Sequence, residues 1–136
     1  MTSAAWPLQQ AMHAALIADA PLVALLGGAR VYDDVPTRGV FPYVTFAPAQ
    51  SRDFGTGSED GEEHIVTLNV WSRGGGRKEA LAIIAAVRGV LHEAALTLAG
   101  HRLVNLRHES SDARRGRDGE SYEGTVRFRA VTEPNV

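Results

Sequence analysis

The sequence has no cysteine among its 136 residues. This absence excludes disulfide bonds, iron–sulfur clusters, thiolate zinc sites and a cysteine nucleophile. It is consistent with assembly in a reducing cytoplasm. Long apolar runs are also missing: none approaches the ~18 residues that a membrane-spanning helix needs, so we expect no membrane partner. Segment 1–7 lacks a basic stretch followed by an apolar one, so we expect no cleaved signal peptide.

An excess of charge of one sign is lacking as well. The chain carries 14 basic and 16 acidic residues, for a formal net charge of −2. A protein whose main task is to neutralise phosphate would be strongly basic. The near balance therefore argues against a dedicated nucleic-acid binder, although it leaves room for a local basic patch.

Enzyme motifs are absent too. The sequence has no H-E-x-x-H metal motif and no G-x-S-x-G nucleophile motif. A glycine run precedes Lys78, but Glu79 follows where a phosphate-binding loop needs Ser or Thr. The five histidines show no metal-ligand spacing, although facing strands could bring His64 and His108 together. We therefore expect no catalytic residue, no metal and no cofactor.

The clearest element that is present is a strand over residues 62–73. Alternation places four residues on one face: His64, Val66, Leu68 and Val70. The opposite face carries Ile65 and Trp71, which are apolar where a solvated face would be polar. This second face therefore needs a cover, either a helical layer or a neighbouring subunit.

Helical periodicity appears in two regions. An apolar stripe predicts a long amphipathic helix over 78–95, with 96–98 as a possible extension. Gly89 lies inside it and suggests close packing on a sheet. Residues 7–26 predict two short helices, the second capped by Asp19. Trp6, just before them, is expected in the core rather than as an anchor for a partner, because large aromatic side chains are mostly buried.

The remaining apolar segments predict further strands, at 30–32, 41–46, 101–109 and 122–131. At 136 residues, the chain is expected to form a single domain over 1–136. The predicted fold class is α+β: a mostly antiparallel β-sheet of about four or five strands, with one long amphipathic helix packed on one face and short N-terminal helices.

Two polar segments are candidates for contacts with other molecules. Segment 51–61 is either an arm that becomes ordered on assembly or a flexible hairpin tip. Segment 113–119 is a basic hairpin tip. It is either a docking surface for an acidic partner, a site near nucleic acid, or a solvated turn balanced by nearby acidic residues. These two segments and Trp71, on the second face of the 62–73 strand, supply the residues of the candidate assembly interface. They are Arg52, Asp53, Phe54, Trp71, Arg114, Arg115 and Arg117.

Over nearly its whole length the chain resembles the small tail-terminator, or tail-completion, proteins of long-tailed phages and gene transfer agents. The most specific part is a strand with Val70-Trp71-Ser72, then a glycine-rich gap, then a helix that begins Arg77-Lys78-Glu79-Ala80. Other matching segments are Ala14-Ala15-Leu16, Pro21-Leu22, Val31 to Pro36, Phe41 to Thr45, Ala99 to Val104 and Gly124 to Ala130.

The resemblance implies a structural protein without catalytic residues. Members form a homohexameric ring that caps the tail tube and joins it to head-completion (adaptor) proteins, and DNA passes through the lumen without specific binding. The chain would then be cytoplasmic during assembly and later lie at the head–tail junction of the particle. The alternative is a small nucleic-acid- or ligand-binding α+β module, and an enzyme comes third.

Overall fold

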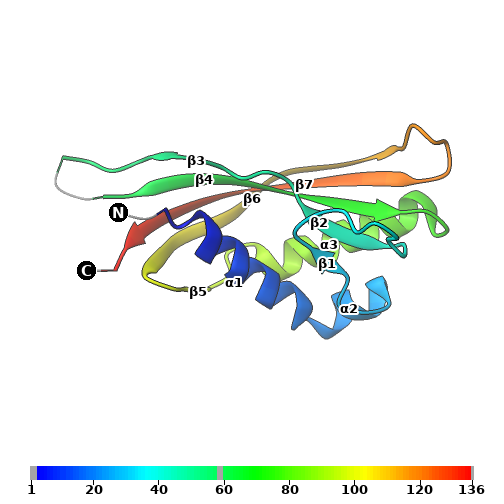
Figure 1. Cartoon of the computed structure of the whole chain (residues 1–136), viewed down its shortest axis with the longest axis horizontal. Coiled ribbons are helices and arrows are strands. Elements are labelled where there is room, and N and C mark those ends of the chain that lie inside the picture. The colour runs from blue at the N-terminus through cyan, green and yellow to red at the C-terminus, as the bar shows by residue number, and fades with distance from the viewer. Residues whose placement is uncertain (1–2, 58–59, 136) are drawn as a thin grey trace.

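The computed structural model describes residues 3–57 and 60–135. Part of the predicted arm 51–61, residues 58–59, lies outside this description. The elements are α1 Ala5–Ile17, α2 Ala20–Leu26, β1 Val31–Tyr32, β2 Tyr43–Phe46, β3 Gln50–Asp53, β4 Glu62–Ser72, α3 Gly76–Leu91, β5 Thr97–Leu98, β6 His101–Arg115 and β7 Tyr122–Pro134. Figure 1 shows one long sheet with the three helices gathered on one side of it.

The α+β class is confirmed, but the strand count is wrong. The sheet has seven strands in the order β1-β2-β4-β7-β6-β5, and β3 pairs with β4 beside that path. All pairings except β1–β2 are antiparallel. The sequence analysis did not predict β3 or β5. β5 has only two residues and all four residues of β3 are exposed, so neither strand shows an alternating apolar pattern. At 13 residues α1 is also nearly as long as α3, which has 16.

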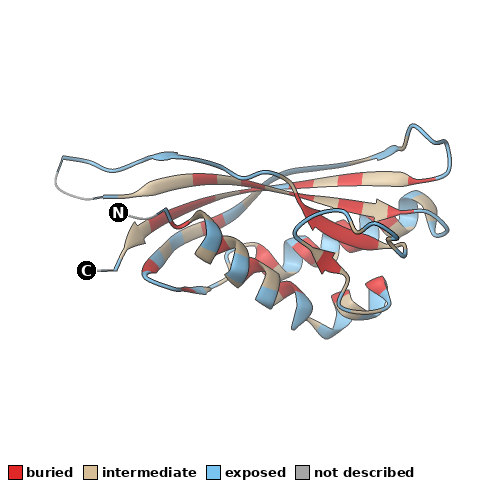
Figure 2. Ribbon diagram, viewed as in Figure 1, coloured by how far each residue is buried: buried red, intermediate tan, exposed pale blue. Residues whose placement is uncertain are grey.

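β4 is the central strand, and its predicted faces are confirmed. It pairs with β7 along its full length, from Glu62 opposite Thr132 to Ser72 opposite Tyr122. The even-numbered residues from His64 to Ser72 are buried, and the odd-numbered ones from Glu63 to Trp71 are partly exposed. Figure 2 shows this alternation along the strand. The buried face joins side chains of all three helices in one hydrophobic core.

α3 packs on β4, β6 and β7 through the predicted stripe, which includes Ile83, Ile84 and Val87. The helix ends at Leu91, four residues earlier than expected. Glu93 adopts a left-handed conformation (φ 58°), and its backbone N–H donates to the Leu106 carbonyl. The chain leaves the helix here because a neighbouring strand offers its backbone a partner.

The N-terminal helices begin and end largely as the sequence indicates. Asp19 caps α2 by accepting a hydrogen bond from the Leu22 N–H (3.0 Å). Gly27 follows α2 in the left-handed conformation (φ 79°) that glycine adopts most readily. The expectation for Trp6 is wrong: its side chain is 57% exposed, because α1 turns Leu8, Met12 and Leu16 toward the core instead.

β6 departs from simple alternation because it carries two irregularities. Its register against β7 shifts between Leu103 and Asn105 and again between His108 and Ser110. The first shift puts Val104 on the exposed side (47%) while Leu106 is buried (1%), although alternation predicts one face for both. Each extra residue reverses the faces that follow it.

Candidate assembly surfaces

All three helices cover one face of the sheet, so the opposite face, called the outer face here, has no helical layer (Figure 1). Trp71 lies on this outer face. Its ring stacks on Tyr43 at a centroid distance of 6.0 Å, and its Nε1 donates to Thr45 Oγ1 (3.0 Å). Neighbours on β2, rather than a helix, therefore cover Trp71 in part and fix its orientation.

A hollow of about 430 Å³ lies beside Trp71, between the loop before β2 and the β6–β7 hairpin. We call it the hairpin hollow. Its lining is Phe41, Tyr43, Trp71, Arg114, Arg115, Gly116, Arg117, Asp118, Ser121 and Glu123. Four of the seven residues predicted from the sequence as interface candidates meet here, although Trp71 is more than 40 positions from the arginines in the chain. The pairing of β4 with β7, and of β7 with β6, produces this proximity.

Most charges at the hairpin hollow are paired within the chain. Arg114 forms ion pairs with Asp112 (3.4 Å) and Glu123 (3.3 Å). Arg115 donates two hydrogen bonds to the Gly119 carbonyl (2.9 and 3.1 Å). Arg117, by contrast, has no hydrogen-bond or ion-pair partner within the described ranges 3–57 and 60–135. Of the three hairpin arginines, only Arg114 is therefore balanced by carboxylates, because the partner of Arg115 is a neutral carbonyl.

The hairpin turn itself is built around Asp118. β6 continues to Arg115, so two of the three arginines predicted at the tip, Arg114 and Arg115, belong to the strand and only Arg117 lies in the turn. The Gly116 N–H closes the turn by donating to the Ser121 carbonyl (2.7 Å). Asp118 accepts hydrogen bonds from the backbone N–H groups of Ser121 and Glu120, which lower the pKa of its carboxyl to about 2. Asp118 also pairs with Arg73 at 3.4 Å.

The other three candidates, Arg52, Asp53 and Phe54, lie on and just after β3, away from the hairpin hollow. Arg52 Nε and Arg129 Nε both contact the Glu63 carboxylate, at 2.5 and 2.6 Å. Hydrogen bonds from Arg52 and then Arg129 lower the pKa of Glu63 below its ordinary value. The Arg129 guanidinium also lies 5.3 Å from the ring centre of Phe54. Glu63 thereby ties β3 to β4 and β7 on the outer face.

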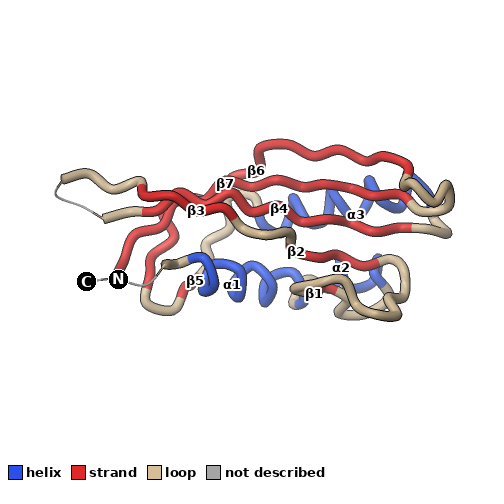
Figure 3. Tube along the Cα trace, turned by 45° about the horizontal axis from the view of Figure 1, so that its top comes forward, coloured by secondary structure: helices blue, strands red, loops and turns tan. Residues whose placement is uncertain are grey.

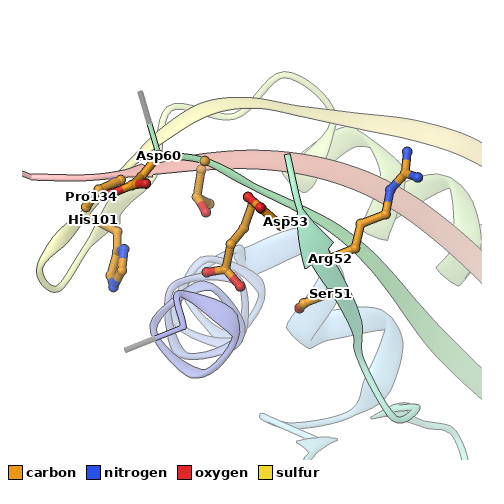
Figure 4. Close-up of a pocket in the computed structure, with 9 residues that line it drawn as sticks. Ser51, Arg52, Asp53, Asp60, His101 and Pro134 are labelled. Carbon is orange, nitrogen blue, oxygen red and sulfur yellow. The ribbon is translucent and has the colours of Figure 1, made fainter. Parts of the chain in front are cut away.

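A second hollow, of about 310 Å³, lies under this arm and is called the arm hollow. β3, the starts of β4 and β6 and the end of β7 line it, and Figure 4 shows Arg52 directed away from His101 and Pro134. The adjoining Glu62 accepts hydrogen bonds from Ser3 Oγ and the Ala4 N–H, which ties the start of α1 to β4.

A buried histidine lies beside the arm, on the face of β4 to which alternation assigned it, but its hydrogen-bond partners were not foreseen. His64 is fully buried, with Nδ1 2.7 Å from Ser51 Oγ and Nε2 2.9 Å from Thr132 Oγ1. Burial lowers its pKa. The suggested approach of His64 to His108 is wrong: β7 aligns His64 with Leu106 through Ala130, and His108 packs edge-on against Phe128 (5.7 Å) two residues further along.

The described part of the chain contains no group of three histidine, aspartate or glutamate residues that could hold a metal. No helix in the described residues is long and apolar enough to cross a membrane. The fold and surfaces thus define a small α+β protein with a sheet covered by helices on one face only, and with two hollows lined by charged residues.

Comparison with known proteins places this architecture in a family. The family model for the tail completion protein gp17 matches residues 10–133, and the chain belongs to that family. A chain from the virion of a native gene transfer agent particle is 34% identical, with a TM-score of 0.88; the match covers 98% of this chain and 99% of that one. A second solved structure, 14% identical with a TM-score of 0.58 and coverage of 96% and 94%, shares the fold. No curated protein matches significantly.

Proposed function

We propose that this protein is a structural component of a virion or gene transfer agent particle, where it terminates the tail. Six copies form a ring that caps the tail tube and joins it to the head-completion proteins, and DNA passes through the lumen. The ring assembles in the cytoplasm and remains at the head–tail junction. The protein acts by contact alone and catalyses no reaction.

One observation carries this proposal: similarity to a virion chain extends over nearly the full length of both molecules, at 34% identity and a TM-score of 0.88. Family membership, which rests on residues 10–133, points in the same direction.

The charge arrangement supports a passive role toward DNA. Around the basic hairpin, Arg73 and Arg114 are paired with carboxylates. On the outer face Arg127 pairs with Glu109 (3.3 Å) and Arg129 with Glu63. DNA binding by counterion release needs cations that are free to meet phosphate. Arg115 and Arg117 of the hairpin have no carboxylate partner among the described residues, but the other four arginines named here are paired. A surface on which most arginines are paired suits a channel that DNA must traverse, and it disfavours the alternative of a small nucleic-acid-binding module.

The two candidate surfaces have complementary roles in this proposal. The hairpin hollow offers aromatic rings framed by arginines, a composition typical of the centres of protein–protein interfaces. The arm offers an exposed strand edge with Phe54, which is 47% exposed. Both surfaces contact other chains in the assembled particle: neighbouring subunits, the tail tube protein or the head-completion protein.

The ring is tested directly by mass photometry and negative-stain imaging of purified protein, with and without tail tubes. The expected result is a six-fold ring that gives no shift of a DNA probe at physiological salt. A strict monomer under both conditions that does shift the probe would overturn the proposal in favour of the nucleic-acid-binding module.

The role of the hairpin is tested by replacing Arg114, Arg115 and Arg117 together with alanine. The variant should fold normally, because all three side chains are exposed, but should reduce the yield of completed particles. The control replaces two exposed basic residues away from the hairpin, Arg38 and Lys78, and should complete particles at the wild-type level. Normal yield from the hairpin variant would remove these arginines from the interface.

A further inference from the structure

The sheet has an unpaired edge along the second half of β6. β5 pairs only with His101 and Arg102. The turn after α3 then occupies the same edge, since Glu93 N–H donates to the Leu106 carbonyl and His108 N–H donates to His92 Nδ1 (3.0 Å). Within the described residues, no backbone partner lies on the far side of 110–115. Alternate residues there direct N–H and C=O groups away from β7, ready to accept another strand.

A second unpaired edge belongs to β3. β3 pairs with β4 on one side only, and all four of its residues are exposed. β3 adjoins β4 on the same side as β2, whereas β6 lies on the other side of β4, beyond β7. The two unpaired edges therefore border opposite sides of one sheet, as Figure 3 shows for β3 and β6.

Two different edges on opposite sides of a molecule favour a particular kind of contact. If the edge of one copy pairs with the other edge of the next, the contact is head-to-tail, and it closes into a ring when the rotation between neighbours divides a full turn. Strand addition of this kind supplies main-chain hydrogen bonds, and the side chains on its two faces determine which partner fits.

Side chains next to the two edges are complementary in charge. On β3, Arg52 lies on the outer face opposite Glu63, and Asp53 lies on the helix side opposite Glu62. On β6, Asp112 lies on the outer face and pairs with Thr125 of β7. On the helix side, Arg88 of α3 lines a groove of about 370 Å³ together with Ser111. Neither Asp53 nor Arg88 has an ion-pair partner in the described part of the chain.

From this arrangement we propose that β3 of one copy adds to residues 110–115 of β6 in the next copy, so that the subunits of the ring share a continuous sheet. Arg52 then faces Asp112 of the next copy on the outer face, and Asp53 faces its Arg88 on the helix side. This inference rests on the proposed ring and names the surface that closes it.

The test uses the absence of cysteine, because introduced thiols are then the only ones in the chain. With Arg52 opposite Asp112, a parallel addition places Ser51 beside Ser111, and an antiparallel addition places it beside Ala113. Ser51→Cys is therefore combined with Ser111→Cys or with Ala113→Cys in the full chain, and purified particles are oxidised. One of the two combinations should give a ladder of covalent multimers beyond the dimer, whereas each single variant should give at most dimers.

The second measurement is the yield of completed particles after the charges of Asp53 and Arg88 are reversed, singly and together. Asp53→Arg and Arg88→Asp should each lower the yield of completed particles about tenfold, because like charges then meet at every subunit contact. The combined variant restores opposite charges and should recover most of the yield. Circular dichroism of each purified variant checks that the fold is retained.

The outcomes separate the contact from the function. If particles contain the chain, but neither cysteine pair gives a ladder and the exchange rescues nothing, the edge pairing is wrong and the proposed function stands. If the wild-type chain is absent from purified particles, the proposed function fails, and the edge pairing fails with it.

Discussion

Gly124 of β7 lies directly beneath α3, where Ile84 packs on the sheet. A Cβ atom at this position would lie 2.7 Å from Ile84 Cδ1 and 3.2 Å from both Ile84 Cγ1 and Val70 Cβ. The contact at 2.7 Å is shorter than real Cβ contacts allow, so a methyl group forces the helix or the Ile84 side chain to shift. We expect Gly124→Ala to lower the free energy of unfolding by about 1–3 kcal/mol, the usual cost of overpacking a core.

The proposed cause can be isolated with a second substitution. Ile84→Val removes the clashing Cδ1 atom and by itself costs about 0.5–1.5 kcal/mol through lost burial. In the double variant the new methyl group occupies the vacated space, so the combined loss should be smaller than the sum of the two, by at least about 0.5 kcal/mol. Urea unfolding followed by circular dichroism measures all three variants, with an unchanged dependence on urea concentration as the check on two-state behaviour.

Gly89→Ala is the matched control, because it makes the same substitution where there is open space. No atom lies within 4 Å of a Cβ built there, and the residue is on the exposed side of α3. Alanine should stabilise the helix by up to ~1 kcal/mol. The close-packing argument is refuted if the losses in the free energy of unfolding for Gly124→Ala and Ile84→Val simply add in the double variant. It is also refuted if the Gly124→Ala variant is as stable as the wild type.

Three further substitutions probe polar contacts. The pKa of Asp118 is lower in the folded chain than in the unfolded one, so the ionised carboxylate stabilises the fold above its unfolded pKa of about 3.9. This stabilisation is lost as the pH falls towards 2. The urea midpoint of Asp118→Asn should therefore decline less steeply over that range than the wild-type midpoint. The pKa of His64 in the folded chain lies below its unfolded value of about 6.5, so the unfolded chain binds more protons. The free energy of unfolding should therefore fall as the pH drops below 6.5. Denaturant titrations at pH 5 to 7.5 should show a weaker dependence on pH for His64→Gln than for the wild type. Asp19→Ala removes the cap of α2 and should cost about 0.5–2 kcal/mol by thermal or urea unfolding, whereas Asp19→Ser should retain most of the stability.

The local sequence pattern correctly predicted those features that depend on residues close together in the sequence. The period-2 pattern of β4 correctly assigned its two faces, and the stripe in α3 correctly assigned its buried side. Asp19 and Gly27 marked the ends of α2, because capping is a contact within one turn of helix. Where a bulge intervened, as near Val104, the pattern failed because an extra residue changes the face without changing the composition.

By itself the sequence determined the α+β class, the central strand, the main helix and the resemblance to tail-completion proteins, because periodicity, capping and motif are properties of short segments. Only the tertiary structure brought Trp71 to the basic hairpin, exposed Trp6, and placed the close approach of helix and sheet at Gly124 rather than Gly89. Each of these depends on strand register and helix rotation, which are fixed by packing between segments far apart in the chain.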